Sequence, residues 1–347
     1  MSKLIFYSTF FIVILFFSCK KDIPPDVPNP STFFSNGGGV FVVNEGNFRF
    51  GNAKISYFDF GTNQVIEDLF KPANQFSLGD VCQSMCLFNN RIYLVVNNSG
   101  KVVVVNSSNF KEIVTIKNLA SPRYFLPITN QKAYVTDLQQ DGISVVDLNT
   151  NELIGKISLK GWTEQLLLLY GKAFVTNQTK EKLYVVDTKN DILEDSIQVG
   201  YASNSIQQDK NGALWVLCGG DSSLQKKATL ARVNPVSRQV ERTFSFSSKA
   251  DSPFRLCMNQ TKDTLYFLNN DVFRLSINDL QLPTQPFINR QTQNFYGLGI
   301  NPFTNEIFIA DAIDYTQKGK IYRYTPNGNL IGTFLAGIIP NDFYFKN

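Results

Sequence analysis

The chain has 347 residues, of which 43% are hydrophobic and 18% are charged, so it can bury a substantial core. Its formal net charge of +4 is small, and no Lys/Arg run or basic stripe indicates binding to nucleic acid. The chain contains no histidine, which excludes Ser-His-Asp and Cys-His catalytic pairs and any His-ligated zinc, copper or haem site.

The N-terminal segment predicts an export signal. Lys3 supplies a positive charge, and residues 4–17 form an apolar run whose length suits a signal peptide better than a membrane span. Ser18 and Cys19 follow, and a small residue before a cysteine resembles a bacterial lipobox. We therefore expect residues 1–18 to be a lipoprotein signal peptide and Cys19 to carry the lipid. An ordinary secretory signal that contains a cysteine is the alternative.

The next segment, residues 19–38, reads CKKDIPPDVPNPSTFFSNGG. Its prolines and glycines are typical of a semi-extended tether, so we expect the folded domain to span residues 39–347. The domain holds four more cysteines, Cys82, Cys86, Cys218 and Cys257. They lack the paired spacing of a metal site, which favours small buried residues in a β-core and leaves a disulfide open as the alternative.

A hairpin pattern recurs along the domain. Residues 143–157 read ISVVDLNTNELIGKI and residues 183–197 read LYVVDTKNDILEDSI, and each is an apolar strand, a polar turn and a second strand. Seven such copies occur, and their first strands end at Asp59, Asn106, Asp147, Asp187, Asn234, Ser276 and Thr325. The spacing between copies is 40 to 49 residues.

Each copy is preceded by two further short strands. One is apolar and usually ends in Asn or Asp, as in AYVTD and AFVTN, and the other lies upstream of it, as in RYFLPI at residues 123–128. Four short strands per repeat, without helical periodicity, predict an all-β, seven-bladed β-propeller. The near-continuous apolar runs fit blades that pack on neighbours through both faces.

The two ends of the domain predict how the ring closes. The C-terminal sequence IIPNDFYFKN resembles an inner strand with nothing after it, whereas the first repeat lacks an inner strand. We expect residues 342–346 to supply the inner strand of the first blade, beside residues 39–44. Deleting the last seven residues should then destabilise the whole domain, because an open sheet edge is left behind.

The architecture places the candidate site on one face of the ring. Long loops in blades 1, 5 and 7 and the segments that lead into the inner strands lie on this face, where rigid scaffolds usually place binding residues. The candidate ligand-binding residues are Phe48, Arg49, Gln83, Arg123, Tyr124, Trp162, Tyr201, Asn204, Arg255, Tyr296 and Tyr315. Aromatic rings and amides suit an uncharged polar ligand or a protein surface. The alternative is that these aromatic residues only close the ends of the channel.

The polar residues that end the second strands allow a different interpretation. Oxygen ligands from several blades could hold Ca²⁺, although capping of the adjacent turns explains a repeated position better. The residues concerned are Asn44, Asn97, Asp137, Asn177, Asn269 and Asp311. We expect no metal, no cofactor and no catalytic residue here.

Two stretches resemble known propellers. YVTD and ISVVDLNTNELIGKI in the third repeat, and their counterparts in the fourth, resemble YncE-like propeller repeats. The stretch NEGNFRFGNAKISYFDF, with FKPANQFSLGDVCQSM after it, resembles the start of surface-layer-type propeller lipoproteins of Bacteroidota. That group includes surface cobalamin-binding lipoproteins that pass vitamin B12 to a TonB-dependent transporter. The resemblance implies the fold and a place in the cell envelope, but no cobalamin-contacting residue carries over.

The leading hypothesis is a non-enzymatic lipoprotein, anchored to the outer membrane and exposed at the surface. It would bind a small molecule or nutrient on the loop-rich face, with an outer-membrane transporter as a partner and no nucleic acid. An interaction scaffold for a protein or a surface polymer is the second hypothesis. A metal-dependent hydrolase of the lactonase type is the third, and the lack of histidine makes it the weakest.

Overall fold

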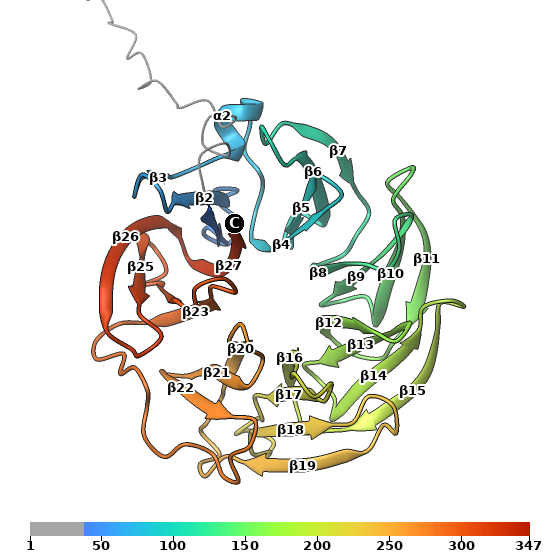
Figure 1. Ribbon diagram of the computed structural model, residues 1–347. Helices are drawn as coiled ribbons and strands as arrows, with labels where there is room; N and C mark the ends of the chain where they lie inside the picture. The colour runs from blue at the N-terminus through green and yellow to red at the C-terminus, as the bar shows by residue number, and fades with distance from the viewer. Residues whose placement is uncertain (1–37) are drawn as a thin grey trace, which may run out of the picture.

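The computed structural model describes residues 38–347, which form a ring of β-sheets (Figure 1). Cavities lined by the inner strands make up a central channel. The expected signal peptide, Cys19 and the tether up to residue 37 lie outside the described residues. Seven sheets make up the ring, so the predicted seven-bladed β-propeller is confirmed. The single helix among the described residues, α2 (Phe70–Asn74), follows the first blade on its outer side.

The strands of each blade run outward from the channel in antiparallel order. The inner strands, from blade 1 to blade 7, are β27 (Pro340–Lys346), β4 (Cys82–Phe88), β8 (Pro122–Pro127), β12 (Thr163–Leu169), β16 (Ser203–Gln208), β20 (Phe254–Met258) and β23 (Phe295–Ile300). The second strands are β1 (Gly39–Asn44), β5 (Arg91–Val96), β9 (Lys132–Asp137), β13 (Lys172–Asn177), β17 (Leu214–Cys218), β21 (Thr264–Asn269) and β24 (Ile307–Asp311).

The third strands contain the first half of each predicted hairpin. They are β2 (Lys54–Asp59), β6 (Lys101–Asn106), β10 (Gly142–Asp147), β14 (Lys182–Asp187), β18 (Thr229–Val233), β22 (Asp271–Ser276) and β25 (Lys318–Tyr324). The outer strands are β3 (Val65–Ile66), β7 (Glu112–Ile116), β11 (Glu152–Ser158), β15 (Ile192–Gln198), β19 (Val240–Ser245) and β26 (Leu330–Ile338).

Blade 6 differs from the other six blades in its outer strand. Its sheet has three strands, and a single bridge between Val272 and Ile288 stands where a fourth strand would lie. The segment between them contains Pro283 and Pro286, which supply no backbone N–H to a ladder. Blade 6 therefore keeps the three inner strands of the repeat but has no regular outer strand.

The core is divided among the seven interfaces between blades. Strand β1 illustrates the reason: Phe41 and Val43 pack toward blade 2, whereas Val40 and Val42 pack toward blade 7. Because successive side chains of a strand point to opposite faces, a strand between two neighbours must be apolar on both faces. This accounts for the unbroken apolar runs of the second and third strands.

Strand β27 closes the ring as predicted. It pairs antiparallel with β1, from Gly39 opposite Lys346 to Asn44 opposite Pro340. Its Phe343 also packs in the interface with blade 7, where Gly299 of β23 leaves no room for a Cβ: such an atom would lie 2.8 Å from the Cβ of Phe343. The last strand thus joins the first blade to the seventh through both hydrogen bonds and packing.

Two further expectations can be compared with the described residues. Cys82, Cys86, Cys218 and Cys257 are free thiols, two of them fully buried, so no disulfide links them. Burial raises the pKa of the Cys86 and Cys218 thiols to about 12. No helix in residues 38–347 has both the length and the apolar character needed to cross a membrane.

Candidate functional site

Every inner strand begins with a β-bulge at the same end of the channel. The pairing register with the second strand shifts directly after the first residue of each inner strand. Such bulges re-aim side chains. The second residues of these strands, which we call the mouth ring, are Asn341, Gln83, Arg123, Glu164, Asn204, Arg255 and Tyr296. The bulged start of the inner strand, repeated by the fold, therefore gathers seven polar side chains, with that of Arg255 one register step deeper than that of Arg123.

Arg123 and Glu164 form a saturated ion pair in the mouth ring. The Nε and Nη2 atoms of Arg123 each donate to Glu164 over 2.8 Å, and Nη1 donates to Gln83 Oε1 over 2.5 Å. Trp162 Nε1 donates to the same carboxylate over 2.6 Å, and the guanidinium stacks 5.2 Å from the indole centroid. Burial opposes the charge on Arg123, but the adjacent carboxylate raises the pKa of Arg123 above its usual value. This network fixes the Trp162 ring and joins blades 2, 3 and 4.

Glu45, which directly follows β1, is held on the opposite side of the channel. Its carboxylate accepts from the Tyr296 hydroxyl over 3.2 Å and from Asn341 Nδ2 over 2.9 Å. Burial raises the pKa of Glu45 above its ordinary value, and the hydrogen bond from Asn341 and the charge of Arg255 offset this only in part. The Glu45 carboxylate is therefore an acceptor whose negative charge burial makes costly.

Arg255 lies between these two groups and is held loosely. Its Nε donates to the carbonyl oxygen of Tyr296 and its Nη1 to the hydroxyl of Tyr124, both over 3.4 Å. Its backbone adopts a left-handed conformation with φ of 59°, which none of the other six mouth-ring residues does. Left-handed backbone is costly for a residue other than glycine or asparagine.

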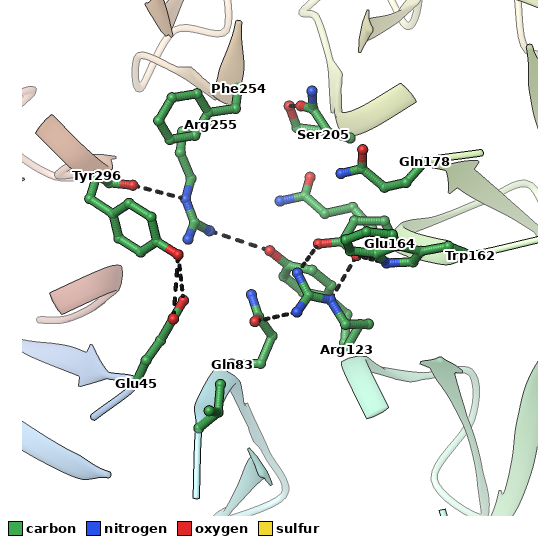
Figure 2. Close-up of a pocket in the computed structure, with 14 residues that line it drawn as sticks. Glu45, Gln83, Arg123, Trp162, Glu164, Gln178, Ser205, Phe254, Arg255 and Tyr296 are labelled. Atoms are coloured by element: carbon green, nitrogen blue, oxygen red, sulfur yellow. Dashed lines mark hydrogen bonds and ion pairs between the residues drawn. The ribbon is translucent and has the colours of Figure 1, made fainter. Parts of the chain in front are cut away.

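Six of the seven mouth-ring residues, all except Asn341, line a cavity of about 320 Å³, which we call the upper chamber. Figure 2 shows its lining side chains converging from several blades on one open space. The lining residues are Glu45, Val81, Gln83, Arg123, Tyr124, Trp162, Glu164, Gln165, Gln178, Asn204, Ser205, Phe254, Arg255 and Tyr296. A few convergent polar groups in a concave site of this size are typical of a small-molecule pocket.

A second cavity of about 480 Å³, the lower chamber, continues along the channel below the first. Tyr124, Gln165 and Arg255 line both cavities and therefore form the wall between them. More of its lining residues are apolar by type than in the upper chamber, and β27 contributes Phe343 and Tyr344 to its wall. Asp342 also lines it, and burial raises the pKa of its carboxyl group.

The structure brings together seven of the eleven residues that we named as ligand-binding candidates. Those that line the upper chamber are Gln83, Arg123, Tyr124, Trp162, Asn204, Arg255 and Tyr296. Phe48, Arg49, Tyr201 and Tyr315 lie outside it. Phe48 and Tyr315 are 58% and 44% exposed on their loops, and the guanidinium of Arg49 lies 5.1 Å from the ring centroid of Phe48.

Sequence reasoning missed Glu45, Glu164 and Gln178. Glu164 is equivalent by register to Gln83 and Arg123, so alignment of the repeats at the start of each inner strand would have found it. Glu45 and Gln178 each follow the last residue of a second strand, Asn44 and Asn177. The sequence analysis had thus identified the strand-ending asparagines, whereas the residues that line the chamber are the ones directly after them.

The polar strand ends are occupied in capping loops. Asp137 accepts from the backbone N–H groups of Ser121, Gln139 and Gln140, and Asp311 accepts from those of Asn294 and Ile313. The four asparagines at the equivalent strand ends, Asn44, Asn97, Asn177 and Asn269, are likewise engaged in hydrogen bonds with neighbouring strands and loops. These bonds fit the capping interpretation. Among residues 38–347 no three His, Cys, Asp or Glu side chains gather into a metal-binding group.

Comparison with known proteins agrees with the fold and leaves the function undefined. Residues 38–345 match the family described as "Domain of unknown function (DUF5074)". No curated protein sequence is significantly similar to the chain.

Solved structures show the same architecture at low sequence identity. A quinonprotein alcohol dehydrogenase-like protein from Bacteroides thetaiotaomicron VPI-5482 has a TM-score of 0.71 and 15% identity, over 89% of this chain and 78% of that one. A functionally unknown protein from Desulfotomaculum acetoxidans DSM 771 has a TM-score of 0.64 and 13% identity, over 89% and 98%. Hydrazine synthase of Kuenenia stuttgartiensis has a TM-score of 0.56 and 14% identity, over 73% and 85%. Their functions are varied or unknown, so these similarities show the fold alone.

Proposed function

Because the chain belongs to the DUF5074 family, whose function is unknown, we propose its function from the channel itself: it binds a small polar ligand in the upper chamber. The observation that carries this proposal is the convergence of polar side chains from several blades on one cavity of about 320 Å³. Their geometry is set by bulged strands and by the Arg123–Glu164 ion pair, so the chamber is formed before any ligand arrives. Such preorganisation lowers the entropic cost of binding.

We further propose that the protein works in the cell envelope, attached through a lipid on Cys19, and passes its ligand to an outer-membrane transporter. The lipobox-like end of the N-terminal segment and the resemblance of the first repeat to surface lipoproteins support this. Cobalamin remains a candidate only for the rim, since a corrinoid ring is larger than the upper chamber. We assign binding rather than catalysis, because the chamber's ion pair is saturated and serves to position Trp162.

Trp162 makes the proposal directly testable. The chain has two tryptophans, and the other one, Trp215, is fully buried away from the chamber. A ligand that enters the upper chamber should therefore change the fluorescence of Trp162, most clearly in a Trp215→Phe background. The probes are sugars, sugar acids, amino acids and cyanocobalamin, titrated into the protein spanning residues 38–347.

A blocked chamber supplies the control. Gln178 lines the chamber and makes no side-chain hydrogen bond in the described structure, so Gln178→Phe should fill the space without removing a structural contact. Gln139→Phe, on an exposed loop outside the chamber, is the matched variant. We expect binding to survive Gln139→Phe and to be lost in Gln178→Phe. Equal binding by both variants would place the ligand elsewhere and refute the proposal.

An interaction scaffold is the second candidate, and a separate observation favours it. Phe48 and Phe50 are 58% and 76% exposed on the long loop of blade 1, beside the half-exposed Tyr315 of blade 7. Exposed aromatic groups of this kind are enriched at protein interfaces. The two roles are compatible, because this loop lies on the same face as the chamber mouth.

A further inference from the structure

We infer that Arg255 is an anion anchor and that the ligand of the upper chamber is a small organic carboxylate that also carries hydrogen-bond donor groups. This inference rests on the proposed ligand binding and names the chemical class of the ligand. Three observations carry it: the unpaired guanidinium, its strained backbone, and the groups that surround it.

The guanidinium of Arg255 has no carboxylate partner among the described residues. Every ion pair within 4.0 Å in residues 38–347 involves other side chains, and the neighbouring Arg123 is neutralised by Glu164. Arginine has five N–H donors. Arg255 uses two of them in hydrogen bonds of 3.4 Å, which is near the upper distance limit for such bonds. The remaining donors border the two chambers. Burial opposes the charge of Arg255, but surrounding groups that include Asp342 and Glu45 outweigh it and raise its pKa. Neither carboxylate lies within 4.0 Å of the guanidinium, so the remaining N–H donors are left for a ligand anion.

The backbone of Arg255 is the second observation. Its φ of 59° is the single positive value in the mouth ring. Strained backbone persists where the surrounding fold enforces it, and it concentrates at binding sites. The hydrogen bond from Ser252 N–H to Asn269 Oδ1 matches the one from Ser121 N–H to Asp137, which places Arg255 in register with Tyr124, one step deeper than Arg123. The bulge of blade 6 thus delivers its arginine to the floor of the upper chamber.

The surroundings of Arg255 define the class of anion. The hydroxyl group of Tyr124 accepts from the guanidinium, and the ring of Tyr296 lies beside it (Figure 2). The planar guanidinium fork matches a carboxylate in two-point contact. Gln165 uses its Oε1 for the N–H of Ile206, so its amide N–H₂ is left for the ligand. Glu45 lies beyond Tyr296 and can accept from a hydroxyl or ammonium group. A hydroxy acid, a sugar acid or an amino acid offers this combination.

Matched pairs of probes test the inference. D-Glucuronate, L-lactate and L-alanine are each titrated beside a neutral counterpart, D-glucose, L-lactamide and L-alaninamide at high pH, with Trp162 fluorescence and calorimetry as readouts. We expect at least one acid to bind at least about tenfold more tightly than its neutral counterpart, since a charged hydrogen-bonded pair contributes this much or more. Arg255→Gln should abolish that preference, and Arg255→Lys should keep part of it.

The outcomes separate the inference from the proposed function. If a neutral probe binds the chamber as well as its acid does, or if inorganic phosphate binds more tightly than every acid, the carboxylate assignment is overturned while ligand binding stands. If Arg255→Gln, shown to be folded by circular dichroism, binds the acids as the parent does, Arg255 is not the anchor. If no probe, acidic or neutral, distinguishes the parent from Gln178→Phe, the proposed function itself fails.

Discussion

The effect of a buried charged side chain on the stability of the fold depends on pH, and Glu45 is the example in this channel. The Glu45 side chain touches the chamber, but the surrounding protein removes most of the bulk water that would solvate its negative charge. Burial therefore raises its pKa in the folded state above the ordinary value of 4.5. The folded protein then binds a proton more tightly than the unfolded chain does. Stability consequently falls as pH rises from 4.5 through the raised pKa.

Glu45→Gln should remove this cost. Gln keeps the shape and can still accept from Tyr296 and Asn341, so we expect a melting temperature higher by on the order of 2 °C at pH 8, with the gain vanishing near pH 4. Glu67→Gln is the opposite control: its pairs with Lys54 and Lys318 outweigh burial and lower the pKa of Glu67, so its charge stabilises the fold at neutral pH. Melting curves from pH 4 to pH 8 measure both. Destabilisation by Glu45→Gln at pH 8 would show that the carboxylate is a net stabiliser.

At the scale of the strand, β27 carries the closure of the ring. It supplies the hydrogen-bonded inner edge of blade 1, and its Phe343 and Phe345 pack on Phe308 of blade 7. Without it, β1 would expose an unpaired edge and the interface between blades 7 and 1 would lose its centre. Loss of this one short strand would therefore remove both the edge hydrogen bonds of blade 1 and the packing between blades 7 and 1.

Deleting residues 341–347 should lower the melting temperature by about 10 °C or more, or abolish cooperative unfolding. The physical reason is that the remaining blades stay joined only in series, so the ring can open at one interface. Deletion of the exposed Asn347 alone is the matched control and should leave the melting curve unchanged. Thermal unfolding followed by circular dichroism measures both, and an unchanged curve for the longer deletion would contradict closure by β27.

Much of this element-scale arrangement could be predicted from the sequence because it repeats. The hairpins, the apolar strands and the closure follow from patterns present seven times, and β2, β6, β10, β14 and β22 end where the pattern placed them. The reduced outer strand of blade 6 was not predicted, since it depends on prolines in a single copy. Only part of the mouth ring was predicted from the sequence. Its members are set by a register shift in the strand pairing, and the residue types give no sign of that shift.

At the scale of the whole molecule, the ring should tolerate a change in the order of its blades along the chain. Each blade packs mainly on its two neighbours, and the described ends lie together: a Cβ on Gly38 would be 3.3 Å from the Cα of Asn347. For folding, the blades are therefore equivalent, except that one of them is the blade in which the two ends of the chain meet. What distinguishes blades is the side chain that each one contributes to the mouth ring.

A circular permutant tests this view. Residues 38–347 are joined end to end by a short Gly/Ser linker and opened between Asn149 and Thr150, in the exposed turn between β10 and β11. Blade 3 then becomes the closing blade, because its outer strand and its inner three strands come from opposite ends of the chain.

We expect a folded protein that melts within about 10 °C of the parent, since only one turn is cut while all seven interfaces remain. The fluorescence of Trp162 should also match the parent, because the Arg123–Glu164 pair that holds it belongs to the inner strands β8 and β12, whereas the cut lies between the third and outer strands of blade 3. A fragment of residues 38–149 is the contrasting case and should aggregate, since it has open interfaces at both ends. An unfolded permutant beside a folded parent would show that the native order of the strands, and not ring closure alone, is needed for folding.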